Sequence, residues 1–254
     1  MTFTIAVAGK GGVGKTSFCA LLMRWLIENK HTPVLAVDAD PNSNLAEALG
    51  VGRIEGSVSD IISKTKDIGG IPPNMSQDEF ISYRMHESLH EGDQFDLIAM
   101  GGPEGPGCYC FPNNVLKKHL QKLTKNYHTV VMDNEAGLEH ISRGTTTENV
   151  DALFILSDTS VRSIRSAARI SNLTDDLKTP IKDKYLILTR GKEGDIEILE
   201  DELKPIGLPV VGLIPEDRQL VEYELAGRAL YELPADSSSV AATNGVLDRI
   251  LGGM

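Results

Sequence analysis

A glycine-rich stretch near the N-terminus carries the clearest chemical signal in this sequence. It fits the pattern G-x-x-x-x-G-K-[ST], with an apolar segment before it and a helical pattern after it. Backbone N–H groups in such a stretch can point at phosphate oxygens, and the N-terminus of the following helix adds partial positive charge. We expect Lys15 to reach the β- and γ-phosphates of a nucleotide and the Thr16 hydroxyl to bind Mg²⁺. The predicted phosphate site comprises Gly9, Lys10, Gly11, Gly12, Val13, Gly14, Lys15, Thr16 and Ser17.

The lysine at position 10 makes this stretch a deviant P-loop (deviant Walker A) pattern, Lys-Gly-Gly-Val-Gly-Lys-Thr. Here the chain resembles the group of dimerising ATPases that includes MinD, ParA and the nitrogenase iron protein. In that group the earlier lysine reaches across a face-to-face dimer to the nucleotide of the partner. The resemblance implies that Lys10 stabilises charge in trans, as an arginine finger does.

Two acidic segments fall where this group has its switches, each after an apolar run that predicts a strand. A carboxylate just past a strand end can orient an attacking water, and Asp40 is our candidate for that role, with Asp38 as its weaker partner. Asp133 ends the second run in the Walker B arrangement and is expected to hold a Mg²⁺-bound water. Gly137 lets the chain approach the γ-phosphate, and its N–H could distinguish ATP from ADP. The group usually has proline where this chain has Glu135, so the switch is expected to move differently.

The base pocket is predicted from two later segments. Members of the group often place an asparagine at the end of a late strand to read adenine, whereas this chain has Thr189 followed by Arg190. Ile214, Pro215 and Glu216 match the loop whose backbone flanks the base in the group. Adenine is favoured over guanine because the guanine-reading pattern Asn-Lys-x-Asp is absent.

A second chemical signal is the pair Cys108 and Cys110. In extended backbone residues two apart point the same way, so both thiols can face one partner. Thiolates suit Zn²⁺, Ni²⁺ or Cu⁺, and a symmetric dimer with the pair on its two-fold axis would supply four ligands. The spacing alone leaves three possibilities open: an intersubunit metal site, two half-buried cysteines near a strand end, or a redox pair.

The neighbourhood of the cysteines resembles a narrower family. The stretch from Pro103 to Cys110, taken with the deviant P-loop, is similar to the CooC-type nickel-maturation ATPases and their AcsF-type relatives, which serve carbon monoxide dehydrogenase and acetyl-CoA synthase. In that family the cysteine pairs of two subunits form one metal site at the dimer interface. The resemblance implies a homodimeric ATPase that uses ATP and Mg²⁺, holds Ni²⁺ or Zn²⁺ on Cys108 and Cys110, and delivers nickel to such a client enzyme.

Other functions fit the sequence less well. A nitrogenase-type iron-sulfur reductase needs a cysteine in the switch region, and residues 133–139 contain none, although Cys-x-Cys pairs from two chains could still bind a cluster. An iron-sulfur scaffold ATPase of the Mrp type would carry Cys-x-x-Cys near its C-terminus, and none is there. A partition or positioning ATPase would need a basic patch or a C-terminal amphipathic anchor, and neither is evident. His86, Glu87 and His90 match the H-E-x-x-H pattern of zinc proteases, but a solvated helix face explains them. Cys19 is expected to be a small core residue.

The chain must fold so that these residues meet. Its 254 residues suit one α/β domain, with an irregular insertion around residues 58–93. Short apolar strands alternating with helices predict a doubly wound, mostly parallel sheet covered by helices on both faces. The strands are expected at Phe3–Ala8, Val34–Val37, Leu97–Met100, Val130–Met132, Ala152–Leu156, Tyr185–Leu188 and Val210–Ile214.

Composition excludes several classes of protein. The 25 basic and 36 acidic residues give a net charge of −11, which argues against binding nucleic acid or anionic membranes. Three cysteines are too few for a disulfide-stapled secreted scaffold. The apolar N-terminus lacks a basic lead-in and a cleavage site, and no run approaches the roughly 20 residues of a membrane span. We therefore expect a cytoplasmic protein.

Overall fold

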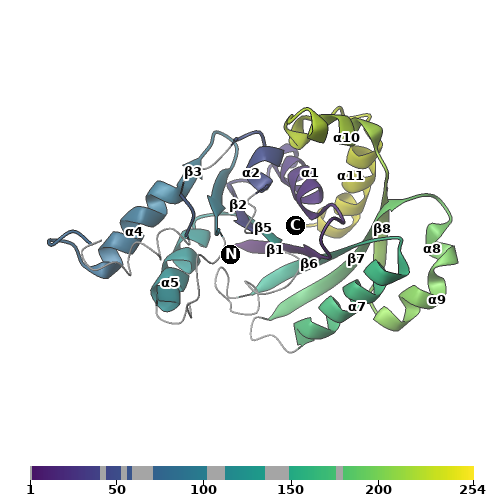
Figure 1. Cartoon of the computed structure of the whole chain (residues 1–254), viewed down its shortest axis with the longest axis horizontal. Coiled ribbons are helices and arrows are strands. Elements are labelled where there is room, and N and C mark those ends of the chain that lie inside the picture. The colour runs from purple at the N-terminus through teal and green to yellow at the C-terminus, as the bar shows by residue number, and fades with distance from the viewer. Residues whose placement is uncertain are drawn as a thin grey trace.

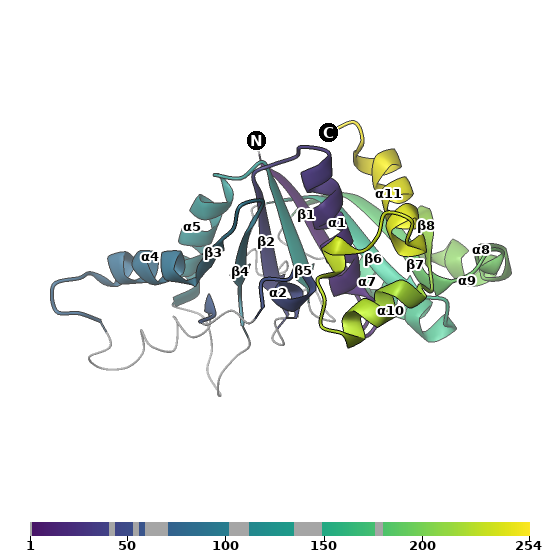
Figure 2. The same ribbon diagram turned by 90° about the horizontal axis from the view of Figure 1, so that it is seen from above.

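An eight-stranded sheet forms the centre of the protein (Figures 1 and 2). The computed structural model describes residues 2–40, 44–52, 56–58, 71–101, 112–134, 149–175 and 180–254. The strand order is β3-β4-β2-β5-β1-β6-β7-β8, and every neighbouring pair is parallel except β3 and β4. The strands are β1 Phe3–Gly9, β2 Val34–Ala39, β3 Leu89–Glu91, β4 Asp96–Ala99, β5 Thr129–Asn134, β6 Val150–Asp158, β7 Ile181–Gly191 and β8 Val210–Pro215.

The central strands are buried on both faces, which explains why their sequences lack polar alternation. In β1, Ile5 and Val7 pack into one hydrophobic cluster, whereas Ala6 and Ala8 pack into the other. Successive side chains of a strand point to opposite faces, so each cluster fills the space between the sheet and one layer of helices. This confirms the predicted doubly wound α/β fold.

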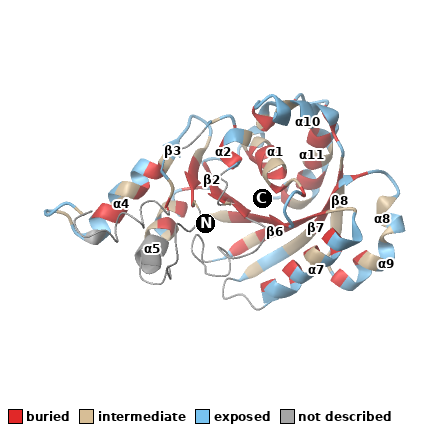
Figure 3. Cartoon of the chain, in the orientation of Figure 1, coloured by how far each residue is buried: buried red, intermediate tan, exposed pale blue. Residues whose placement is uncertain are grey.

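Helices cover both faces of the sheet, and their buried sides face it (Figure 3). One face carries α1, α2, α11 and η2, with α10 packing against them through Leu220 and Tyr223. The other face carries α4, α5, α7 and α9. The helices are α1 Lys15–Glu28, α2 Leu45–Ala48, α4 Gln77–Ser88, α5 Pro112–Thr124, α7 Val161–Asp175, α8 Asp195–Ile198, α9 Glu200–Leu203, η1 Lys204–Ile206, α10 Arg218–Leu225, η2 Leu230–Glu232 and α11 Ser238–Leu251.

The described part of segment 58–93 contains regular structure. Ser76 caps α4 in a capping box, in which its hydroxyl accepts from the Glu79 N–H and the Glu79 carboxylate accepts from the Ser76 N–H. The chain then continues into β3, which pairs antiparallel with β4. A segment expected to be irregular therefore adds a helix and an edge strand to the sheet.

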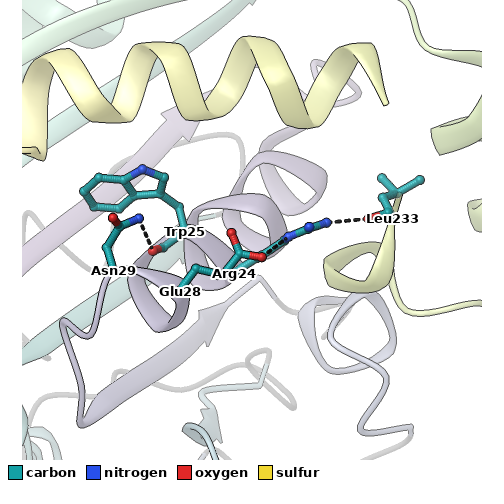
Figure 4. A network of polar contacts seen from close by, with 5 residues as sticks. All are labelled: Arg24, Trp25, Glu28, Asn29 and Leu233. Carbon is teal, nitrogen blue, oxygen red and sulfur yellow. Dashed lines mark hydrogen bonds and ion pairs between the residues drawn. The ribbon is translucent and has the colours of Figure 1, made fainter. Parts of the chain in front are cut away.

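Helix α1 is tied to the C-terminal part of the chain at several points. Arg24 donates both to Glu28 and to the Leu233 carbonyl, and the Asn29 side chain donates to the Trp25 carbonyl at the helix end (Figure 4). The Trp25 indole N–H also donates to a carboxylate oxygen of α11 at 2.7 Å. The bonds to Leu233 and to α11 fix the position of α1 against the C-terminal part of the chain, and the phosphate loop leads directly into α1.

Among the described residues, no helix has the length and apolar character needed to span a bilayer.

Candidate functional site

The phosphate loop leaves the sheet at a tightly packed point. A Cβ built on Gly9 would lie 2.5 Å from the carbonyl oxygen of Leu156 on β6, so only glycine lets β1 and β6 approach this closely. Gly14 caps α1 with a left-handed φ of 86°, and the helix begins at Lys15. The loop therefore directs the open N-terminus of α1 toward the carboxyl edge of the sheet, where an anion is stabilised by the helix N–H groups.

Lys15, Thr16 and Asp133 meet beneath this loop. Lys15 is buried, and its ammonium group donates to the Lys10 carbonyl at 3.4 Å. The Thr16 hydroxyl donates to Asp133 Oδ2 at 2.7 Å, while Asp133 Oδ1 is buried without a hydrogen-bond partner in the described part of the chain. An unpaired carboxylate oxygen beside a hydroxyl is an oxygen donor set suited to Mg²⁺, so these residues fit the predicted ion.

Asp38 and Asp133 are direct neighbours on β2 and β5. Burial, followed by the nearby charge of Asp133, raises the pKa of Asp38 to about 7. Burial also raises the pKa of Asp133 to about 6, although the Thr16 hydrogen bond and the Lys15 charge oppose the shift. Two buried carboxylates on neighbouring strands favour the binding of either a proton or a cation beside them.

Asp38 also shapes the segment that follows β2. Its two oxygens accept from the backbone N–H groups of Asp40 at 3.1 Å and Leu45 at 3.0 Å. Asp38 is fully buried, whereas Asp40 is half-buried at the strand end. The Asp38 carboxylate thus orders the segment that follows β2, and Asp40 is the more accessible of the two aspartates.

A cavity of about 190 Å³ adjoins the loop between the ends of β7 and β8. The base-pocket residues on β7 and at the end of β8 were predicted from two separate segments of the sequence. In the structure both groups line this one cavity, beside α1. The cavity is lined by Val13, Gly14, Ser17, Thr189, Arg190, Ile214, Pro215 and Glu216, together with residues of α1, α10 and the start of α11.

Thr189, which lines this cavity, also bonds to the backbone on either side of it. Its hydroxyl donates to the Val13 carbonyl at 2.9 Å and to the Ser157 carbonyl at 3.3 Å. Its single proton is therefore committed to the backbone, and Thr189 links β7 to the phosphate loop. The next residue, Arg190, is exposed and adopts a left-handed φ of 55°, a strained conformation that places it at the rim of the cavity.

Comparison with known proteins identifies the fold family. Residues 4–230 match the family described as the CobQ/CobB/MinD/ParA nucleotide binding domain. The chain belongs to this family.

Several relatives span nearly the whole chain. An uncharacterised ATP-binding protein of Methanocaldococcus jannaschii is 40% identical over 250 residues, covering 97% of this chain and 98% of the relative. The carbon monoxide dehydrogenase accessory protein CooC of Rhodospirillum rubrum is 33% identical over 242 residues, covering 90% and 89%. The fold matches the septum site-determining protein MinD of Pyrococcus horikoshii in complex with Mg-ADP, with a TM-score of 0.70, 20% identity and coverage of 99% and 96%.

As a member of the CobQ/CobB/MinD/ParA family, the protein is an ATPase built on a P-loop. Three of the predicted site residues, Gly137, Cys108 and Cys110, lie outside the described residues. The H-E-x-x-H pattern is divided between two elements, because α4 ends at Ser88 and His90 belongs to β3. Cys19 is fully buried in the core as expected.

Sequence reasoning missed the residue that holds the far wall of the cavity. Asp217 Oδ1 accepts from the first N–H groups of α10, and Oδ2 accepts from the Ser237 hydroxyl at 2.5 Å and the Ser239 N–H at 2.8 Å. Burial alone would raise the pKa of Asp217, but these hydrogen bonds outweigh it and hold that pKa below its usual range. The N-cap of α10 was readable from the sequence, but the bonds to α11 were not.

Asn134 is a second residue that the sequence did not single out. Its side-chain amide donates to the Val7 carbonyl at 3.0 Å, and its Oδ1 is buried without a partner among the described residues. It follows Asp133 directly, so it fixes the end of β5 against β1 where the Walker B strand meets the phosphate loop.

Proposed function

We propose that this protein is an ATP-dependent, dimerising metallochaperone that inserts nickel into the active site of a carbon monoxide dehydrogenase or an acetyl-CoA synthase. The pair Cys108 and Cys110 carries the proposal, because two thiolates from each of two chains complete a four-ligand metal site. The similarity to the accessory protein CooC supports this class of client.

The nucleotide would bind with its base in the cavity between β7 and β8 and its phosphates at the loop. Lys15 in cis and Lys10 in trans would neutralise charge that develops on the phosphates, and Asp40 would orient the attacking water. Thr16 and Asp133 would hold Mg²⁺, which neutralises phosphate charge when bound.

One backbone hydrogen bond joins the ends of β2 and β4, and the chain runs from the end of β4 into the sequence that contains the cysteines. The N–H of Met100, just after β4, donates to the Asp38 carbonyl at 2.7 Å. The cysteine-bearing segment begins immediately after this point, between Gly101 and the start of α5. A change in the β2 end on hydrolysis would therefore reach the first residues of that segment, and the coupling of nucleotide to metal affinity must be reciprocal.

Equilibrium metal binding tests the proposal. Ni²⁺ and Zn²⁺ are titrated into wild type, the Cys108→Ala/Cys110→Ala variant and the Cys19→Ala control, with and without a non-hydrolysable ATP analogue. We expect metal bound at half the chain concentration in wild type and the control, no such binding in the double variant, and a nucleotide-dependent affinity. Unchanged metal content in the double variant would refute the proposal, and an iron-containing brown preparation would favour a cluster.

A further inference from the structure

No basic patch is evident in the overall composition, but one end of the molecule gathers positive charge away from the nucleotide site. Between Pro112 and Lys125 the sequence contains four lysines and one histidine and no acidic residue, although the chain as a whole has a net charge of −11. This stretch forms α5 and the turn after it. Helix α5 lies beside α4 at the end of the sheet that carries β3, away from α8 and α9 (Figures 1 and 2).

Two lysines at this end of the molecule are exposed to solvent. They are Lys118 and Lys122, and neither has an ion-pair partner within the described ranges. Beside them, α4 and α5 enclose a groove of about 130 Å³ whose lining contains no carboxylate. We call Lys118 and this groove the α5 basic face; the polar residues of the groove are Ser82, His86, His119, Lys122 and Asn126.

Among the described residues, the carboxylates of the neighbouring helix α4 pair with groups other than Lys118 and Lys122. Glu87 accepts from Tyr83 at 2.7 Å and pairs with Arg84 at 2.6 Å. Glu79 is used in the capping box of α4. Asp78 lies 3.1 Å from the His119 ring and holds that ring at the edge of the groove. Two acids of α4 thus have partners in their own helix or at its N-cap, and Asp78 has one in His119. Lys118 and Lys122 of α5 are exposed.

The position of the face suggests what it contacts. Helix α5 begins two residues after Cys110, so any protein that takes metal from the cysteines must approach the N-terminal end of α5. We propose that the α5 basic face is the docking surface for an acidic surface of the client enzyme, an inference that rests on the proposed metallochaperone function. Opposite charges on the two surfaces would steer the encounter and set its register, while the rest of this acidic chain repels the client.

Paired charge reversals test this surface. Binding of the metal-loaded proteins to the purified client, carbon monoxide dehydrogenase or acetyl-CoA synthase, is measured by surface plasmon resonance at low and high salt. We expect Lys118→Glu/Lys122→Glu to weaken binding by about ten-fold or more, mainly through slower association, and to remove most of the salt dependence. The milder Lys118→Gln/Lys122→Gln variant is expected to fall between it and wild type.

The control carries the same change in net charge elsewhere. Arg169 on α7 and Lys182 at the start of β7 are both exposed and belong to other parts of the molecule. Arg169→Glu/Lys182→Glu is expected to bind the client within about two-fold of wild type. Equal weakening in both reversals would mean general repulsion and would overturn the proposal, as would unchanged binding in the α5 variants.

Two further readouts separate this inference from the proposed function. The α5 variants are expected to hydrolyse ATP, dimerise and hold metal as wild type does, because none of the changed residues lies in the nucleotide site. Wild type that holds metal but binds neither client would refute the docking surface alone. Wild type that holds no metal on its cysteines would refute the metallochaperone function. Loss of dimerisation in the α5 variants would assign the face to a second copy of the chain instead.

Discussion

Asp133 is the residue on which the proposed Mg²⁺ site depends most directly. One of its oxygens accepts from Thr16, and the other is buried with no partner among the described residues. Asp133→Asn keeps the shape and removes the charge, so we expect Mg²⁺-dependent ATP hydrolysis to fall by about 100-fold or more. Steady-state phosphate release measures this. Asp151→Asn, which alters a carboxylate bonded to the Thr4 N–H, is the control and should retain activity.

The same acidic pair predicts how stability depends on pH. The pKa values of Asp38, about 7, and Asp133, about 6, lie above those of the unfolded chain. Protonated side chains are therefore favoured in the folded state, and the stability they contribute is lost as pH rises from about 4 through about 7. The asparagine in Asp38→Asn would not titrate, so for the nucleotide-free protein the unfolding free energy of Asp38→Asn minus that of wild type should increase as pH rises from about 5 to about 8. A constant difference measured by denaturant titration across that range would contradict the assignment.

At the scale of single residues, the sequence could predict roles only where a local motif suggests them. Lys15, Thr16 and Asp133 were identified because a P-loop and a strand-end aspartate are short patterns with a fixed context. The hydrogen bond from Thr189 to the Val13 carbonyl was not predicted, since the two residues are 176 positions apart in the chain. Asp217 was missed for the same reason, because its bonds to α11 exist only after the chain has folded.

At the scale of elements, the junction of β1 with the phosphate loop sets a strict packing limit. A methyl group on Gly9 would strike the backbone of β6, whereas one on Gly11 would meet no heavy atom within 4 Å. We expect Gly9→Ala to destabilise the protein by about 3 kcal/mol and Gly11→Ala to change stability little. Chemical denaturation compares the two variants, and equal midpoints would show that β1 and β6 can separate without cost.

The wall formed by β8, α10 and α11 depends on one carboxylate. Asp217→Asn removes a negative charge that accepts four hydrogen bonds, so we expect a loss of about 2 kcal/mol in unfolding free energy and several-fold weaker nucleotide binding. The stabilising effect of Asp217 should also decline as pH falls, because its folded-state pKa is depressed. Asp236→Asn, an exposed change nearby, is the control. Nucleotide affinity that is equal in both variants would exclude a positioning role.

The elements themselves divide into those the sequence could specify and those it could not. Apolar runs such as that of β1 predicted strands correctly because burial on both faces removes polar residues altogether. Strand β3 has three residues, two of them exposed, so it carries no hydrophobic pattern. Helix α4 has a weak apolar face, and only its Ser76–Glu79 capping box was available as a signal. A short strand such as β3 forms because β4 supplies its hydrogen-bond partners. Partners that meet only in the folded protein cannot be identified from the local sequence.

At the scale of the whole molecule, the question is whether one chain contains a complete active site. Lys15 is nearly buried beside the loop, but Lys10 is exposed in the same loop, and only its backbone carbonyl is bonded to Lys15. An exposed lysine on an acidic protein can reach a second chain placed against the loop. The proposed function therefore requires that two chains exchange this residue.

Mixing two inactive variants tests that exchange. Lys10→Ala keeps its own Lys15 but cannot complete its partner's site, whereas Lys15→Ala has a defective site but still offers Lys10. A heterodimer of the two contains one site with both lysines. Random pairing of equal amounts makes half of the dimers mixed, each with one of two sites restored, so hydrolysis should return to about a quarter of the wild-type rate. If Lys10 acts within its own chain, no mixed site contains both lysines, and the mixture will stay as inactive as its components.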